Sequence, residues 1–175
     1  MESRAKLFGH AIHPMLIVFP LGLLGTAAIF DALYLITSNS GLATASFWMI
    51  IAGIIGGLLA ALFGFIDWFK IPSGTRAKSV GLYHSILNEI TLILFAIGLY
   101  LRWSTPAIPP TIATICSFVG LGLALIGAWF GGELVERLGV SVSANANLNA
   151  PSSLTHERVN TGDVDVRQHT LHPTH

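Results

Sequence analysis

The chain has 175 residues, of which 53% are hydrophobic and only 10% charged, and its formal net charge is zero. Soluble domains carry roughly 25% charged residues, so the composition argues against a soluble globule. The balanced charge argues against a nucleic-acid-binding surface. One cysteine excludes an intramolecular disulfide and any cysteine-based metal motif.

The first predicted helix covers about residues 14–36, after a short cytosolic lead of residues 1–8. Its only charge is Asp31. Pro14 suits the first turn of a helix, where a missing N–H costs nothing. Pro20 lies inside the helix, where it removes a hydrogen bond and predicts a kink.

Three further apolar runs predict helices over about residues 46–69, 82–103 and 111–134. Each is close to the 20 or so residues that cross a bilayer core. The sequence therefore predicts an all-α integral membrane protein, a four-helix transmembrane bundle within residues 9–140. Residues 141–175 are rich in Ser, Asn and Thr, which predicts a disordered polar tail.

Small residues recur along the second and fourth predicted helices. Such residues let helix backbones approach closely in lipid, where no hydrophobic attraction drives helices together. The residues assigned to helix packing are Gly53, Gly57, Gly127 and Gly131.

Basic residues near the helix ends predict the orientation in the membrane. Arg102 alone lies on one side. The other side carries Arg4, Lys6, Lys70, Arg76, Lys78 and Arg137. The positive-inside rule therefore predicts that both termini are cytoplasmic, in a bacterial cytoplasmic (inner) membrane.

Polar residues gather at the cytoplasmic ends of all four predicted helices. The candidate ligands are His10, His13, Asp67, His84 and Glu133, with Asn88 and Glu89 beside them. Because the helices alternate in direction, these residues are expected at one depth. Asp31 is not expected at this depth, since 18 residues of helix place it about 27 Å beyond His13.

Each of these residues also has an ordinary structural explanation. The two N-terminal histidines fit polar residues at a membrane interface. Asp67 and Glu133 fit ion pairs with loop cations, and Asn88 fits a hydrogen bond between helices. The joint depth of the group favours a shared site, and His13 with His84 is the natural pair.

Three chemistries suit such a group. Imidazole and carboxylate bind transition metal ions. Two histidines on facing helices can instead ligate the iron of haem b. A His/carboxylate cluster at membrane depth can also relay protons or bind a coupling ion. Nothing resembles a hydrolytic triad, a phosphate loop or a nucleotide fold, so no enzyme activity is predicted.

Several motifs together resemble a bacterial membrane family known as domain-of-unknown-function family 2231. They are Gly9-His10-Ala-Ile-His13-Pro14 with Phe19-Pro20, Asp31, Gly64-Phe-Ile-Asp67, His84-Ser-Ile-Leu-Asn88 and Gly131-Gly132-Glu133-Leu134-Val135. The resemblance covers about residues 8–142 and implies four helices and a bacterial membrane location, with no established activity. Glu136 and Leu138 replace a Tyr and a His of the family pattern.

The leading functional hypothesis is a binding protein that holds a transition metal ion or haem b at the cytoplasmic membrane face. Its partners would be the lipid bilayer and either a membrane redox protein or a second copy. One alternative is a structural or partner-binding subunit whose polar residues only join helices. The other is a small proton-coupled transporter, which four helices without a visible inverted repeat disfavour.

Overall fold

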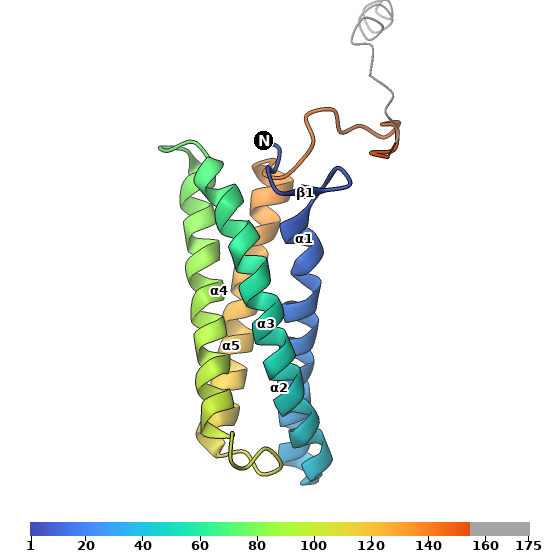
Figure 1. Cartoon of the computed structure of the whole chain (residues 1–175). Helices are drawn as coiled ribbons and strands as arrows, with labels where there is room; N and C mark the ends of the chain where they lie inside the picture. Colours follow the sequence, from blue (N-terminus) through green and yellow to red (C-terminus); the bar gives the residue numbers. More distant parts are fainter. Residues whose placement is uncertain (155–175) are drawn as a thin grey trace, which may run out of the picture.

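The computed structural model describes residues 1–154. Its four long helical segments lie side by side (Figure 1). The all-α four-helix prediction is confirmed. The elements are α1 (Ile12–Leu16), α2 (Val18–Thr37), α3 (Ser40–Lys70), α4 (Arg76–Leu101), α5 (Thr111–Gly132) and the π-helical turn η1 (Glu133–Arg137). Together α1 and α2 form the first of four segments long and apolar enough to cross a membrane.

The first helix is interrupted at Ile17, between α1 and α2. Pro20 has no N–H to offer the Leu16 carbonyl one turn earlier, and its ring crowds that carbonyl. The helix resumes with the Leu21 N–H on the Ile17 carbonyl at 3.1 Å. The break leaves His13 on a short separate turn above the main helix.

Two helices begin earlier than the apolar runs predicted. α3 begins at Ser40 instead of about 46, because the Asn39 side chain accepts a hydrogen bond from the Gly41 N–H at 3.0 Å. α4 begins at Arg76 instead of about 82, because the Thr75 hydroxyl accepts one from the Lys78 N–H at 3.2 Å. Polar caps of this kind set helix starts independently of hydropathy.

The outer surface of the bundle is apolar. The exposed side chains include Ile29, Leu33, Leu58, Leu62, Ile93, Ile97, Ile126 and Leu125. Exposed aromatic residues lie near both ends, with Trp48, Tyr100 and Trp103 at one end and Phe69, Tyr83 and Trp129 at the other. An apolar band between aromatic belts is typical of a membrane-spanning protein.

The bundle consists of two helical hairpins. α2 packs along α3, and α4 packs along α5, while the contacts between the hairpins are fewer. The pairs α3·α4 and α2·α5 form those contacts, so α2 lies diagonally opposite α4. Leu24, Ala27, Ile50 and Phe95 form a buried cluster between the hairpins.

A short antiparallel β-hairpin precedes the bundle, with β1 (Lys6–Leu7) paired to β2 (His10–Ala11). Its two turn residues, Phe8 and Gly9, have φ angles of 50° and 84°. Two consecutive positive φ angles match the strand twist of a tight hairpin, which explains the glycine. The sequence analysis assigned no strand to this lead.

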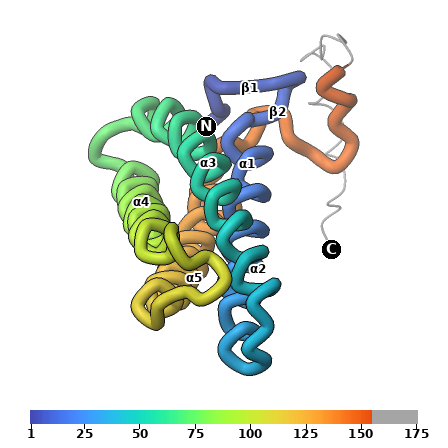
Figure 2. Tube along the Cα trace, turned by 60° about the horizontal axis from the view of Figure 1, so that its bottom comes forward, coloured from blue at the N-terminus to red at the C-terminus, as the bar shows by residue number. Residues whose placement is uncertain are grey.

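The chain after the bundle lies against the lead (Figure 2). The Met1 amino group donates to the Gly139 carbonyl at 2.8 Å, and the Ser141 N–H donates to the Met1 carbonyl at 2.8 Å. Further along, the Ser153 hydroxyl donates to the Phe8 carbonyl at 3.0 Å. Residues 141–154 therefore have defined contacts, and the rest of the predicted tail, 155–175, lies outside the described residues.

Candidate functional site

His13 is fixed by a hydrogen bond to the neighbouring helix. Its Nδ1 lies 2.8 Å from the carbonyl oxygen of Ala60 on α3. A carbonyl only accepts, so Nδ1 carries a proton, and Nε2 is the nitrogen that can hold a lone pair for a ligand. Gly64, one turn beyond Ala60, lies against the ring: a Cβ there would be 3.0 Å from His13 Cε1.

His84 on α4 is fixed in the same way against α5. Its Nδ1 lies 2.8 Å from the carbonyl oxygen of Gly127, so its Nε2 can also hold a lone pair for a ligand. Gly131, one turn beyond Gly127, lies against the ring: a Cβ there would be 3.1 Å from His84 Cε1. A hydrogen bond of this kind orients a histidine for metal ligation.

The two imidazole rings lie next to each other between diagonally opposite helices. Their centroids are 6.2 Å apart and their planes are nearly perpendicular, at 88°. Both residues are half-buried. Two imidazoles, each tethered through Nδ1 to a different helix, therefore meet at one depth of the bundle, as the sequence analysis expected for this pair.

Asn88 lies one turn after His84 and supports it. Its Nδ2 donates to the His84 carbonyl at 2.8 Å and lies 3.3 Å from the ring Nδ1 and 3.4 Å from the ring Nε2. A Cβ at position 127 would be 3.1 Å from Asn88 Oδ1. Glycine at 127 thus lets the His84 and Asn88 side chains lie against the backbone of α5.

Asp67 does not join the pair. Its carboxylate accepts the Ser3 hydroxyl at 2.7 and 2.8 Å and the Arg4 N–H at 3.1 Å. Only 6% of Asp67 is exposed. Its observed role is to anchor the lead to the end of α3, a use for this carboxylate that the sequence analysis missed.

The remaining candidates also lie apart from the pair. Glu133 forms an ion pair with Arg76, which joins η1 to the start of α4. His10 is exposed, and its Nε2 lies 3.2 Å from the Ser153 hydroxyl. Glu89 is exposed on α4. Within residues 1–154, no group of three or more His, Cys, Asp and Glu side chains is placed to hold a metal ion.

Asp31 and Arg102 form a buried ion pair at the other end of the bundle, and the sequence analysis missed it. Arg102 donates from Nη1 to Asp31 Oδ1 at 2.9 Å and from Nη2 to Oδ2 at 2.8 Å. Both side chains are 0% exposed. The hydroxyls of Ser46 and Ser117 each accept a further bond at 3.3 Å. The sequence did contain a signal for this pair, because Asp31 and Arg102 are isolated charges of opposite sign that the topology places at the same end of the bundle.

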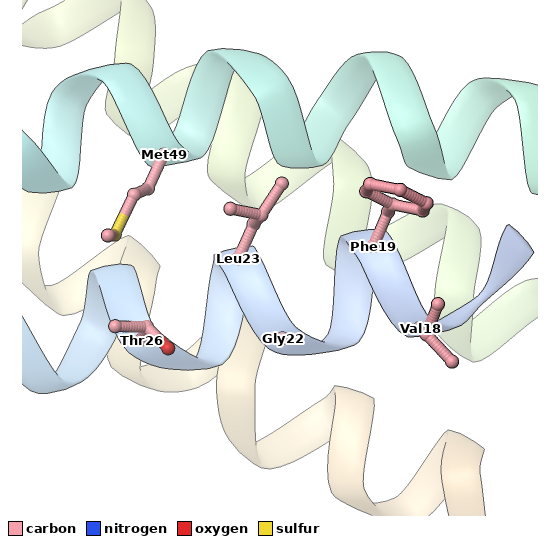
Figure 3. A pocket seen from close by; sticks show the side chains of 6 residues that line it. All are labelled: Val18, Phe19, Gly22, Leu23, Thr26 and Met49. Carbon is pink, nitrogen blue, oxygen red and sulfur yellow. The ribbon is translucent and has the colours of Figure 1, made fainter.

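A shallow groove between α2 and α3 is apolar (Figure 3). Its lining residues are Val18, Phe19, Gly22, Leu23, Thr26 and Met49. None of these side chains titrates or binds a metal strongly. The groove therefore offers no catalytic or metal-binding side chain. The histidine pair remains the candidate site for binding a ligand.

One family model matches the chain. It carries the description "Predicted membrane protein (DUF2231)" and matches residues 9–144. The chain belongs to this family. No curated protein and no solved structure matches the sequence or the fold. The resemblance inferred from the motifs is confirmed, and the description assigns a membrane location without an activity.

Proposed function

We propose that this membrane protein binds a transition metal ion or haem b between His13 and His84. The observation that carries the proposal is the pair of neighbouring imidazoles, each with Nδ1 hydrogen-bonded to a backbone carbonyl. Such bonds fix the tautomer and raise the basicity of the ligating nitrogen. Desolvated polar groups in a membrane bundle are costly and usually serve a ligand or a transport path.

The geometry favours ligand binding over a purely structural role. A histidine that only joins helices satisfies its N–H and needs no second imidazole beside it. Here each N–H is already satisfied within its own hairpin, and the two rings still lie next to each other, with their centroids 6.2 Å apart. Under the positive-inside rule the ligand lies near the cytoplasmic face of a bacterial inner membrane.

The test is a visible spectrum and elemental analysis of the full-length protein purified in detergent, before and after incubation with ferric haem or a divalent metal. We expect a stoichiometric ligand that His13→Ala and His84→Ala each remove. His10→Ala is the matched control, because His10 lies three positions away but bonds to Ser153, and it should keep the ligand.

Thermal stability gives a second readout. A ligand that binds only the folded state stabilises it, so each single variant should melt earlier. The double variant should add little, because residues that hold one ligand are not additive. If the wild-type protein holds neither metal nor haem after reconstitution, the histidines only join helices and the protein is a structural or partner-binding subunit.

A further inference from the structure

The two histidines make equivalent contacts with the second helix of their own hairpins. His13 bonds to the carbonyl of Ala60 and lies against Gly64, while His84 bonds to that of Gly127 and lies against Gly131. His84 comes 71 positions after His13 in the sequence. The contacted residues of the second hairpin, Gly127 and Gly131, each come 67 positions after their counterparts in the first hairpin. Each histidine therefore makes the same two contacts inside its own hairpin.

The equivalence continues along the bundle. The Leu24 side chain fills the space beside Gly53, where a Cβ would approach it to 2.6 Å. Phe95 fills the space beside Gly120 in the same way, with a closest approach of 2.9 Å. Phe95 comes 71 positions after Leu24, and Gly120 comes 67 positions after Gly53, which are the same two separations.

The buried ion pair follows the same rule. Asp31 and Arg102 are themselves 71 positions apart, so they occupy equivalent places in the two hairpins. Both hairpins also run in the same direction, since each enters from the end that carries its histidine (Figure 1). The two halves are therefore related by a two-fold axis along the bundle, the parallel-repeat arrangement known in membrane proteins.

We infer that the chain is a duplicated helical hairpin whose two equivalent imidazoles bind one iron porphyrin, haem b, on the internal two-fold axis. This inference rests on the proposed function and names its ligand. A metal ion on a two-fold axis forms equivalent bonds with equivalent residues of the two halves. The symmetry leaves the angle between the two bonds open, and the separation of the rings decides it.

The distance between the rings agrees with trans coordination. With metal–nitrogen bonds of about 2.0 Å and about 1.2 Å from ring nitrogen to ring centroid, trans imidazoles place their centroids about 6.4 Å apart. A tetrahedral angle would reduce this separation to about 5.2 Å. The observed 6.2 Å is closer to the trans value.

The missing donors point to a porphyrin rather than a bare ion. Protein sites for Zn²⁺ or Cu²⁺ use three or four side-chain ligands, and no third His, Cys, Asp or Glu joins this pair in the part of the chain that the structure describes. A porphyrin supplies four nitrogens itself and needs only axial ligands from the protein. The single cysteine, Cys116, is buried in α5, so haem would be held without thioether bonds.

The wild-type protein offers a test that needs no variant. Full-length protein is incubated with ferric haem in detergent and examined by visible absorption and electron paramagnetic resonance. We expect one haem per chain, low-spin, with the strongly anisotropic signal of two axial imidazoles in perpendicular planes, since the rings here lie at 88°. A high-spin or five-coordinate spectrum would overturn the inference.

Equivalence of the two ligands is tested with His13→Gly and His84→Gly. Each should convert bound haem to a high-spin form by a similar extent, and added imidazole should restore the low-spin spectrum in both. Haem that stays low-spin without imidazole in either variant contradicts the trans pair. Stoichiometric metal without haem, lost in both variants, contradicts the porphyrin but leaves the proposed function standing. Absence of both ligands overturns both proposals.

Discussion

Single side chains in this protein are positioned by backbone groups more than by one another. The two histidines are oriented by carbonyls of Ala60 and Gly127, and the ring of each lies against a glycine. Those carbonyls belong to helix turns, so the anchoring points are as rigid as the helices themselves. Small residues next to the rings are therefore part of the site, although they carry no chemistry.

The glycines beside the rings give the first prediction. A methyl group at Gly64 or Gly131 would approach the ring to 3.0 or 3.1 Å, so the ring must shift and its hydrogen bond to the carbonyl must lengthen. Loss of such orienting bonds typically costs about 10–100-fold in metal affinity. Titration with ferric haem should show Gly64→Ala and Gly131→Ala weakened to a similar extent.

The control for these variants is Gly22→Ala. A Cβ at position 22 meets nothing within 4 Å, and the same substitution there should leave haem affinity unchanged. Equal affinities for all three variants and the wild type would show that the glycines do not position the rings.

Glu2 gives a prediction about pH. The Lys6 side chain, the Ala144 N–H and the Ser143 hydroxyl bond to its carboxylate and lower its pKa from about 4.5 to about 2. A depressed carboxyl pKa means that the tether to Ala144 is fully present above pH 4.5 and is lost as the pH falls through about 2. The amide proton shift of Ala144, followed by NMR in detergent, should titrate with a midpoint near 2.

Glu2→Gln should abolish that titration, because the amide has no ionisation near these pH values. A midpoint near 4.5 in the wild-type protein would mean that the carboxylate does not hold the chain after the bundle against the lead.

The helices are joined differently at the two ends of the bundle. Near the histidines, Lys78 donates to the Trp68 carbonyl at 2.8 Å while the Trp68 indole donates to the Lys78 carbonyl at 3.1 Å, which links α3 to α4. At the other end the Asp31–Arg102 pair links α2 to the end of α4. Because these two charges occupy equivalent positions of the hairpins, two copies of one hairpin would place like charges together. The pair therefore favours association of the two different hairpins.

The ion pair is tested by removing one partner and then both. Asp31→Leu leaves the Arg102 guanidinium buried without its carboxylate, and the loss of stability is expected to be about 3–5 kcal/mol. Asp31→Leu with Arg102→Leu should recover most of this loss, because the uncompensated charge is gone. Thermal unfolding in detergent, followed by circular dichroism, measures both.

A conservative control is Ser46→Ala, which removes only a 3.3 Å hydrogen bond to Arg102 and should cost about 1 kcal/mol. If the double variant is as unstable as the single one, the site depends on polar bonding rather than on charge compensation.

At the scale of the whole molecule, hydropathy predicted the fold well because four apolar runs of bilayer length leave few alternatives. It could not predict that α3 and α4 begin at polar caps, since Asn39 and Thr75 precede the apolar runs. The depth argument placed His13 and His84 together, and their ring centroids lie 6.2 Å apart, but Asp67 and Glu133 bind local partners instead. The internal two-fold axis was invisible because most equivalent residues differ, as Leu24 and Phe95 do.

The orientation of the bundle remains a prediction that rests on its basic residues. The basic residues of the loops and lead lie at the end of the bundle that carries the histidines, whereas Arg102 at the other end is neutralised by Asp31. The positive-inside rule counts Lys and Arg and gives acidic residues little weight, so the six basic residues at the histidine end of the bundle against Arg102 alone predict the orientation. We expect the loop between α3 and α4 to be cytoplasmic and the loop between α4 and α5 to be periplasmic.

Single cysteines at Ser73 and Ala107, introduced into a Cys116→Ala background, test this orientation in intact cells. Ser73 lies in the turn between α3 and α4, and Ala107 lies in the loop between α4 and α5. A thiol reagent that does not cross the inner membrane should label Ala107→Cys in whole cells and Ser73→Cys only after lysis. Cys116 is buried in α5, so its removal should not alter the pattern. The reverse labelling would place the histidine pair near the periplasmic face, where its ligand would arrive from outside the cell.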